Sequence, residues 1–200
     1  LAAVGATWLW CKPWHAPATF GRVWCLFEAL KTVDLGKELV LVMAADEQAS
    51  LRATLIECFD DIMRILSSID VAAADATNPN DKEFIFGLIG ARDGGFARFN
   101  ADLTAALRLW LLGAARAELV AMTRERGDDD LEANKLRNNV ARLLKDLGHY
   151  DEAELMYRQV LAIDENAFGE DQRLVAALLN LANLLKAQSK FAEAEPMFRR

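Results

Sequence analysis

The stretch RVWCLFEAL, residues 22–30, contains a carboxylate whose setting could support chemistry. If this stretch is helical, Glu28 lies about one turn after Trp24 and next to Phe27. A glutamate at the mouth of a site can work as a catalytic carboxylate. On an amphipathic helix that buries the tryptophan and the phenylalanine, the same residue is a solvated charge. The residues alone leave both interpretations of Glu28 open.

Histidine and cysteine, the other common ligands and nucleophiles, are few and scattered. The two histidines, His15 and His149, lie far apart and show no spacing of metal ligands. The three cysteines, Cys11, Cys25 and Cys58, form no close pair, which indicates reduced thiols and an intracellular protein. We therefore expect no metal site and no bound cofactor.

The composition is that of an acidic, core-forming chain. Of its 200 residues 53% are hydrophobic, and 30 acidic against 23 basic residues give a net charge of −7. Without a block of lysine or arginine, nucleic acid and anionic membranes are not expected as partners. No run reaches the roughly 18 apolar residues of a membrane helix. From the scattered cysteines we expect a cytoplasmic protein. The chain starts at Leu1 and ends inside a helical pattern, so we expect a fragment of a longer protein.

The elements around Glu28 have the pattern of a βαβ unit. The apolar run at 6–11 and the aliphatic run LVLVM at 39–43 predict buried strands, and a helix is expected between them at about 20–33. Buried parallel strands have unbroken apolar sequences of this kind. Residues 1–46 therefore predict part of an α/β domain.

This order of strand, loop, WCxxE stretch, helix and aliphatic strand resembles the second half of Toll/interleukin-receptor (TIR) domains. In enzymatic members of that family, the glutamate of WCxxE lies at the site that cleaves NAD at its glycosidic bond. The resemblance implies that Trp24 and Cys25 pack the helix and that Glu28 is the catalytic carboxylate. Such a group could orient ribose hydroxyls and stabilise an oxocarbenium-like transition state.

The middle of the chain predicts helices without a catalytic arrangement. Apolar residues at helical intervals predict one amphipathic helix over 48–70, a short helix over about 82–91 and a long helix over about 100–124. The segments AAADATNPND and RDGG separate them as loops. We interpret residues 47–124 as a helical connector.

The end of the chain contains an internal repeat. Residues 139–158, NVARLLKDLGHYDEAELMYR, align with residues 180–199, NLANLLKAQSKFAEAEPMFR, at an offset of 41, with ten of twenty positions identical. Leucines at helical spacing followed by Gly148 predict that each unit is a pair of helices. A fixed period of this length is typical of stacked helical repeats.

Small residues stand where the paired helices must approach, at Ala141 and Ala153, and the bulky Tyr157 follows. This arrangement resembles a tetratricopeptide repeat. The long connector DENAFGEDQRL, in which we place the extra length of the unit, and the phrase AEAEPMFRR resemble the kinesin-light-chain type. Because such arrays need about three units for a continuous core, we expect residues 125–200 to be an incomplete array that continues beyond Arg200.

The first helix of each unit is expected to line a concave groove. Helical spacing places Lys135, Asn139 and Arg142 on one stripe, and Asn180 and Asn183 on the matching stripe of the second unit. Asparagine can donate to and accept from a peptide backbone, while lysine and arginine can pair with acidic groups. In similar repeats these positions hold a peptide of a partner protein. The alternative is an ordinary solvated polar face.

Together these features predict a mainly α fold, in which a truncated TIR-like βαβ piece and a helical connector precede a tetratricopeptide α-solenoid. We expect a protein-interaction adaptor or scaffold in intracellular signalling that binds partner peptides in its groove. One alternative is an NAD hydrolase that the repeats regulate or target, with NAD as substrate and not as cofactor. Another is a structural scaffold without a specific peptide. The sequence does not indicate an oligomeric state.

Overall fold

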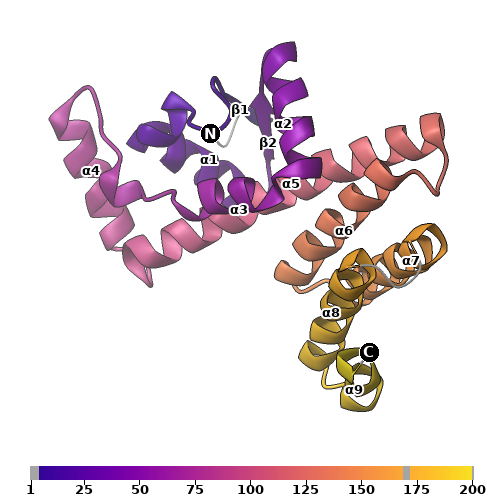
Figure 1. Ribbon diagram of the computed structural model, residues 1–200. Coiled ribbons are helices and arrows are strands. Elements are labelled where there is room, and N and C mark those ends of the chain that lie inside the picture. The colour runs from indigo at the N-terminus through magenta and orange to yellow at the C-terminus, as the bar shows by residue number, and fades with distance from the viewer. Residues whose placement is uncertain (1–4, 169–171, 200) are drawn as a thin grey trace. The chain divides into compact units, whose positions relative to one another are not determined.

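The computed structural model describes residues 5–168 and 172–199, which are mostly α-helical (Figure 1). Its contacts divide it into two compact units. The first unit comprises Leu1–Thr54 and Cys58–Leu111, and the second comprises Leu55–Glu57 and Leu112–Arg200. The predicted α-solenoid preceded by helices and a small α/β piece is confirmed.

The first unit begins with the predicted βαβ arrangement. Strands β1 (Ala6–Trp10) and β2 (Glu38–Val42) pair in parallel, and α1 (Val23–Asp34) connects them. The helix starts later than predicted, because a short 3-10 helix, η1 (Ala18–Gly21), precedes it. The parallel pairing of the two apolar runs was predicted correctly.

Only one face of this two-stranded sheet is covered in the described part of the chain. On that face the hydroxyls of Thr7 in β1 and Thr32 in α1 lie 2.5 Å apart, and Leu9 is buried. Trp8 and Trp10 alternate with these residues, so they face the other way. They are 69% and 51% exposed. The prediction of two buried strands is therefore wrong. α1 packs on one side of the sheet alone, and every residue of β2 is half-buried or exposed.

The predicted helix over 48–70 is interrupted. It consists of α2 (Ala45–Glu57) and α3 (Phe59–Ser67), which are separated at Cys58 by a non-helical backbone with φ −132° and ψ 45°. A second 3-10 helix, η2 (Val71–Ala73), follows α3. Asn78 is the N-cap of helix α4 (Pro79–Gly90), and its side chain accepts a hydrogen bond from the backbone N–H of Asn80.

The long helix α5 (Gly95–Arg126) starts five residues before the predicted position, directly after the turn that contains Gly94. The interior of the first unit is formed by Leu9 of β1 and by apolar residues of its helices. It includes Leu9, Val23, Leu26, Ala29, Leu30, Leu51, Phe59, Ile62, Ile85, Ile89, Phe99, Leu103 and Leu107.

The second unit contains the predicted helix pairs. They are α6 (Leu131–Asp146) with α7 (Tyr150–Phe168), and α8 (Gln172–Ala187) with α9 (Phe191–Arg199), and each helix contacts the next (Figure 1). The extra length of the first repeat lies partly in α7 itself, which extends through Asp164–Phe168, so these residues are not the loop that we predicted. The middle of the predicted connector lies outside the described residues.

The two repeats end their first helices in the same way. After α6, the N–H of His149 donates to the carbonyl of Leu144, and Gly148 has φ +81°. After α8, the N–H of Lys190 donates to the carbonyl of Leu185, and Ser189 has φ +62°. This is the left-handed helix ending that commonly requires glycine.

The predicted packing of small and aromatic residues is confirmed in the first repeat. Ala141 and Ala153 are completely buried, and Tyr157 is buried beside them in α7. In the second repeat Ala182 and Ala194 are buried in the same way. Alanine at these positions allows close approach of the paired helices.

Among the described residues, we find no helix that combines the length and the apolar character required to cross a bilayer.

Candidate functional site

The predicted groove residues of α6 already contact another part of the chain. The Asn139 side chain is 7% exposed, and its Nδ2 donates to the carbonyl of Leu55 at 2.8 Å and to that of Ile56 at 3.4 Å. The ammonium of Lys135 lies 2.7 Å from Oε1 of Glu57. Both side chains therefore hold Leu55–Glu57, a segment that belongs to the same compact unit.

These contacts follow from the position of the segment at the end of α2. The last carbonyls of a helix have no partner within the helix. The Asn139 carboxamide supplies a donor to two of them. A lysine near this end is also favourable, because the helix dipole places partial negative charge there. We predicted that Asn139 and Lys135 would contact a partner peptide. In the structure they contact two main-chain carbonyls and a carboxylate of the protein itself.

The remaining predicted groove residues lie on α6 and α8. Arg142 is half-buried on α6, and Asn183 is exposed on α8. Asn180 donates through Nδ2 to Oδ1 of Asn138 at 2.9 Å, which links the first helices of the two repeats. The sequence analysis missed Asn138. Helical spacing placed Asn139 on the stripe that was expected to face a peptide. The neighbouring Asn138 therefore fell outside that stripe, and nothing else in the sequence indicated its contact with Asn180.

A buried polar network lies behind this face of α6, and the sequence analysis also missed it. Asn134 donates to Oδ1 of Asp164 at 2.8 Å and accepts from Nη1 of Arg137 at 3.0 Å. Arg137 is 6% exposed, and burial lowers the pKa of its guanidinium. Because buried polar groups are costly unless they are paired, this network fixes how α6 and α7 pack together.

A charged cluster connects the two repeats on their second helices. Glu154 in α7 lies 2.6 Å from Nζ of Lys190 and 2.8 Å from Nη2 of Arg158, which also contacts Glu193 of α9 at 3.0 Å. The hydrogen bond from Lys190 is the main reason that the pKa of Glu154 lies below its usual value. This cluster orders the repeats rather than offering an open site, since each charge has a partner.

Glu28 lies in α1 and is half-buried. Its backbone carbonyl accepts a hydrogen bond from Oγ1 of Thr32 at 2.7 Å. Burial, and secondarily the nearby charge of Glu28, raise the pKa of the Cys25 thiol. Trp24, which the resemblance assigns to helix packing, is 38% exposed. Its ring packs edge to face on the ring of Phe27, with 6.3 Å between the ring centroids.

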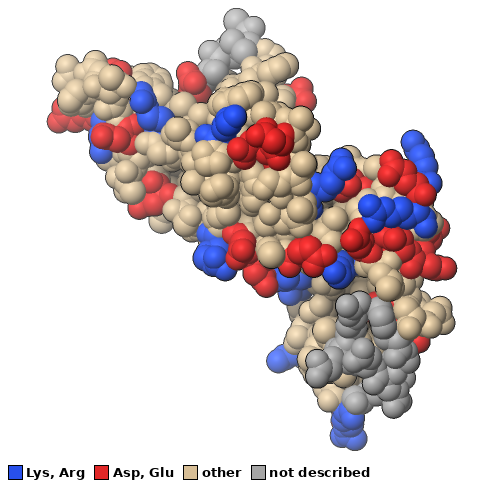
Figure 2. Space-filling model, turned by 45° about the horizontal axis from the view of Figure 1, so that its top comes forward, with Lys and Arg blue, Asp and Glu red and all other residues tan. Residues whose placement is uncertain are grey.

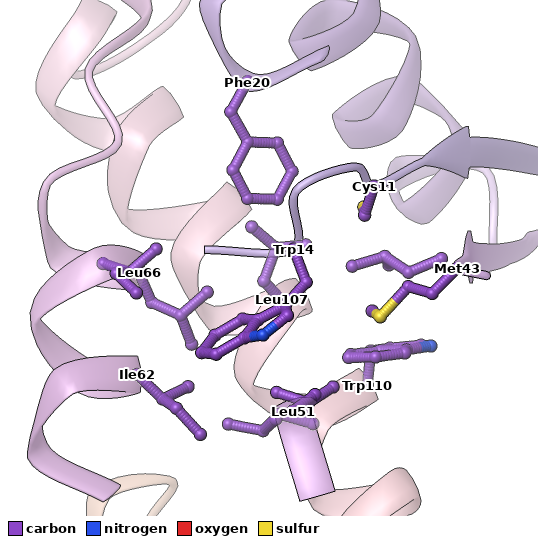
Figure 3. A pocket seen from close by; sticks show the side chains of 12 residues that line it. Cys11, Trp14, Phe20, Met43, Leu51, Ile62, Leu66, Leu107 and Trp110 are labelled. Carbon is purple, nitrogen blue, oxygen red and sulfur yellow. The ribbon is translucent and has the colours of Figure 1, made fainter. Parts of the chain in front are cut away.

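The first unit contains a small apolar cavity beside Trp14 (Figure 3). Its volume is about 30 Å³, and its lining is almost entirely apolar. The indole Nε1 of Trp14 donates to Oγ of Ser50 at 3.0 Å. Burial raises the pKa of the Cys11 thiol to about 11, so this lining residue is a poor nucleophile at neutral pH. A space of this size and character is a packing gap and not a ligand site.

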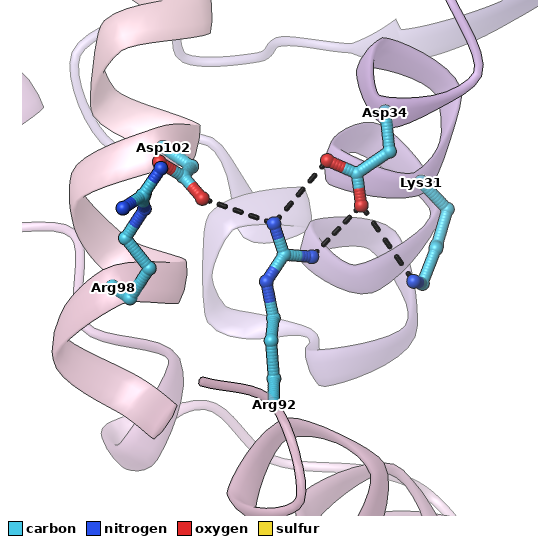
Figure 4. Close-up of polar contacts among 5 residues, drawn as sticks. All are labelled: Lys31, Asp34, Arg92, Arg98 and Asp102. Atoms are coloured by element: carbon cyan, nitrogen blue, oxygen red, sulfur yellow. Dashed lines mark hydrogen bonds and ion pairs between the residues drawn. The ribbon is translucent and has the colours of Figure 1, made fainter. Parts of the chain in front are cut away.

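A polar cluster in the first unit links α1 to α5 through Arg92, which lies in the turn after α4 (Figure 4). Arg92 makes two hydrogen bonds to the Asp34 carboxylate, at 2.8 and 3.3 Å, and one to Asp102 at 3.0 Å. Arg98 and Lys31 complete the cluster as partners of Asp102 and Asp34. The Arg92 hydrogen bond is the main cause of a lowered pKa at Asp34.

The charged surface also bears on the kind of partner. On the face drawn in Figure 2, acidic and basic side chains alternate, and the described basic residues do not gather into a continuous patch. The described residues also contain no group of three or more His, Cys, Asp or Glu side chains that could hold a metal ion.

Comparison with known proteins places the C-terminal part of the chain. No curated protein and no protein of solved structure matches the sequence. A family model described as tetratricopeptide repeat matches residues 131–200. The match starts at the first residue of α6 and covers both helix pairs. Residues 131–200 are therefore tetratricopeptide repeats, a class of structure that generally mediates protein–protein interaction.

Proposed function

We propose that this protein is an interaction adaptor or scaffold that binds a peptide segment of a partner protein in the groove lined by α6 and α8. The observation that carries the proposal is the contact of Asn139 and Lys135 with Leu55–Glu57. These side chains bind two main-chain carbonyls and one carboxylate, so this surface is suited to recognising polypeptide. We place this adaptor in intracellular signalling.

The groove has further contacts beyond those two residues. Asn183 is exposed on α8, one turn from Asn180, and Arg142 adds a positive charge on α6. Asparagine side chains can donate to and accept from a peptide backbone, and arginine can pair with an acidic side chain. The proposal therefore favours peptides that contain acidic residues.

The test is selection of binders from a phage-displayed library of random short peptides. We expect enriched peptides to contain acidic residues and to lose binding when Asn139→Ala and Asn180→Ala are combined. Asn80→Ala, which alters an exposed asparagine of α4, is the matched control and should leave binding unchanged. Enrichment of no peptide, or binding unaffected by the double substitution, would contradict the proposal.

A second candidate function is hydrolysis of NAD by a TIR-like domain. The parallel βαβ order of β1, α1 and β2, with Glu28 on the connecting helix, supports it. In that case Glu28 would stabilise the positive charge that develops on the ribose. The test measures NAD consumption by the protein and by its Glu28→Gln variant. Turnover that disappears in the folded variant supports this function, and absence of turnover in both excludes it.

We also propose that the repeats are of the kinesin-light-chain type. The offset of 41 residues between the two units is longer than the usual period of about 34 residues. The extension of α7 through Phe168 accounts for part of the difference.

A further inference from the structure

The segment Leu55–Glu57 contacts the first repeat as a bound peptide would. Leu55 is 3% exposed, and its carbonyl accepts the shorter of the two hydrogen bonds from Asn139. The carbonyl of Ile56 accepts the longer one, and the carboxylate of Glu57 pairs with Lys135. The segment thus presents an apolar anchor, two main-chain acceptors and an acidic side chain in sequence.

The segment is the last turn of α2, and the helical backbone is interrupted directly after it. Helix α2 ends at Glu57, and Cys58 is exposed with a non-helical backbone before α3 begins. The ion pair at its end is also open to solvent, since the side chains of Lys135 and Glu57 are 40% and 54% exposed. Ion pairs of this kind contribute little, so the Asn139 hydrogen bonds and the burial of Leu55 hold most of the segment. A competing peptide could supply the same acceptors and the same apolar group.

We propose that Leu55–Glu57 is an internal ligand of the first repeat and that a partner peptide binds at Asn139 by displacing it. The inference rests on the proposed function of the groove. It also defines the partner more closely, as a segment with an apolar residue, two accessible main-chain carbonyls and an acidic side chain at the position of Glu57. The apparent affinity for the partner then depends on the fraction of molecules in which Leu55–Glu57 is bound at Asn139.

The experiment uses a fluorescently labelled synthetic peptide of residues 51–60, in which serine replaces Cys58. Its binding to the whole chain is measured by fluorescence anisotropy. If the internal segment fills the groove for about 90% of the time, the apparent affinity is reduced about tenfold. Glu57→Lys places like charges at Lys135 and releases the segment, so we expect this variant to bind the peptide about tenfold more tightly. Adding Asn139→Ala to it should abolish binding.

Two further variants separate release of the segment from other effects. Glu83→Lys reverses the charge of an exposed glutamate in α4 and should bind the peptide as weakly as the original chain. Combining Glu57→Lys with Lys135→Glu restores an attractive internal pair. Measured with a peptide that carries lysine in place of Glu57, so that the peptide's own pair with residue 135 is kept, this double variant should bind as weakly as the original chain. If Glu57→Lys proves insufficiently stable, Leu55→Ala provides a second way to weaken the internal segment.

The possible failures are distinguishable. Equal binding by the original chain and the released variants would overturn the inference of an internal ligand, while the groove would remain a peptide site. No binding by folded, released variants would instead count against the proposed function at Asn139. In that outcome the Asn139 contacts are a helix cap and nothing more.

Discussion

Tyr157 is fully buried in α7, and its hydroxyl has no hydrogen-bond partner within the described part of the chain. Burial also raises the pKa of the phenol, so the group is neutral at all ordinary pH values. The ring is part of the core of the second unit, in which Ala141 and Ala153 are also buried. The ring therefore contributes to packing, whereas the hydroxyl is a polar group removed from water without compensation.

We expect Tyr157→Phe to leave stability unchanged or to raise it by about 1 kcal/mol, because it removes an unsatisfied buried group and keeps the ring. The free energy of unfolding from urea denaturation measures this effect. Tyr150→Phe, at an exposed tyrosine of the same helix, is the matched control. A clear loss of stability in Tyr157→Phe would show that the hydroxyl has a partner after all.

At the scale of elements, Arg92 in the turn after α4 connects two helices of the first unit, α1 through Asp34 and α5 through Asp102 (Figure 4). The Asp34 carboxyl has a pKa below its usual value of 3.8 in the folded protein. A carboxyl with a lowered folded pKa contributes stability that is present above its unfolded pKa. This stability is lost as the pH falls through the folded pKa.

We therefore expect the first unit to lose stability as the pH falls below about 4, and Asp34→Asn to reduce this loss. The measurement compares urea midpoints at about pH 6 and at about pH 3 for the original chain and the variant. Asp93→Asn, at an exposed neighbouring aspartate, should keep the original pH dependence. An identical dependence in all three proteins would contradict a role for Asp34.

The elements were predictable where local patterns determine them. The aliphatic run at 39–43 and the apolar run before it gave the parallel strands, and the repeat alignment gave both helix pairs. The break at Cys58 was not predictable, because apolar residues keep their helical spacing across it. The division of the chain into a partial α/β domain (1–46), a helical connector (47–124) and a repeat domain (125–200) stays a prediction.

The candidate site was predictable only in part, for a related reason. Helical spacing located Lys135 and Asn139 on α6, but it cannot show what a side chain contacts. Asn139 donates to Leu55, which lies 84 positions away in sequence. Contacts of such separation are set by the tertiary fold, and a single sequence has no local signal for them.

At the scale of the whole molecule, the chain has two compact units, each with its own buried core. Leu26 of α1 is completely buried in the first unit, and Leu144 of α6 is completely buried in the second. Units with separate cores can open as separate cooperative units. Helix α5 runs through the boundary between Leu111 and Leu112, so the chain also offers a route by which they could unfold together.

The distribution of tryptophan allows a direct test of independence. All five tryptophans, at positions 8, 10, 14, 24 and 110, belong to the first unit. Tryptophan fluorescence therefore follows that unit alone, while far-ultraviolet circular dichroism follows helices of both. We expect Leu26→Ala to destabilise the fluorescence transition by about 2–5 kcal/mol, the usual cost of such a cavity. Leu144→Ala should leave the fluorescence transition unchanged. It should lower the stability of the second unit, which is seen only in the circular dichroism. If Leu144→Ala shifted the fluorescence transition as much as Leu26→Ala does, the two units would unfold as one, and α5 would be the element that couples them.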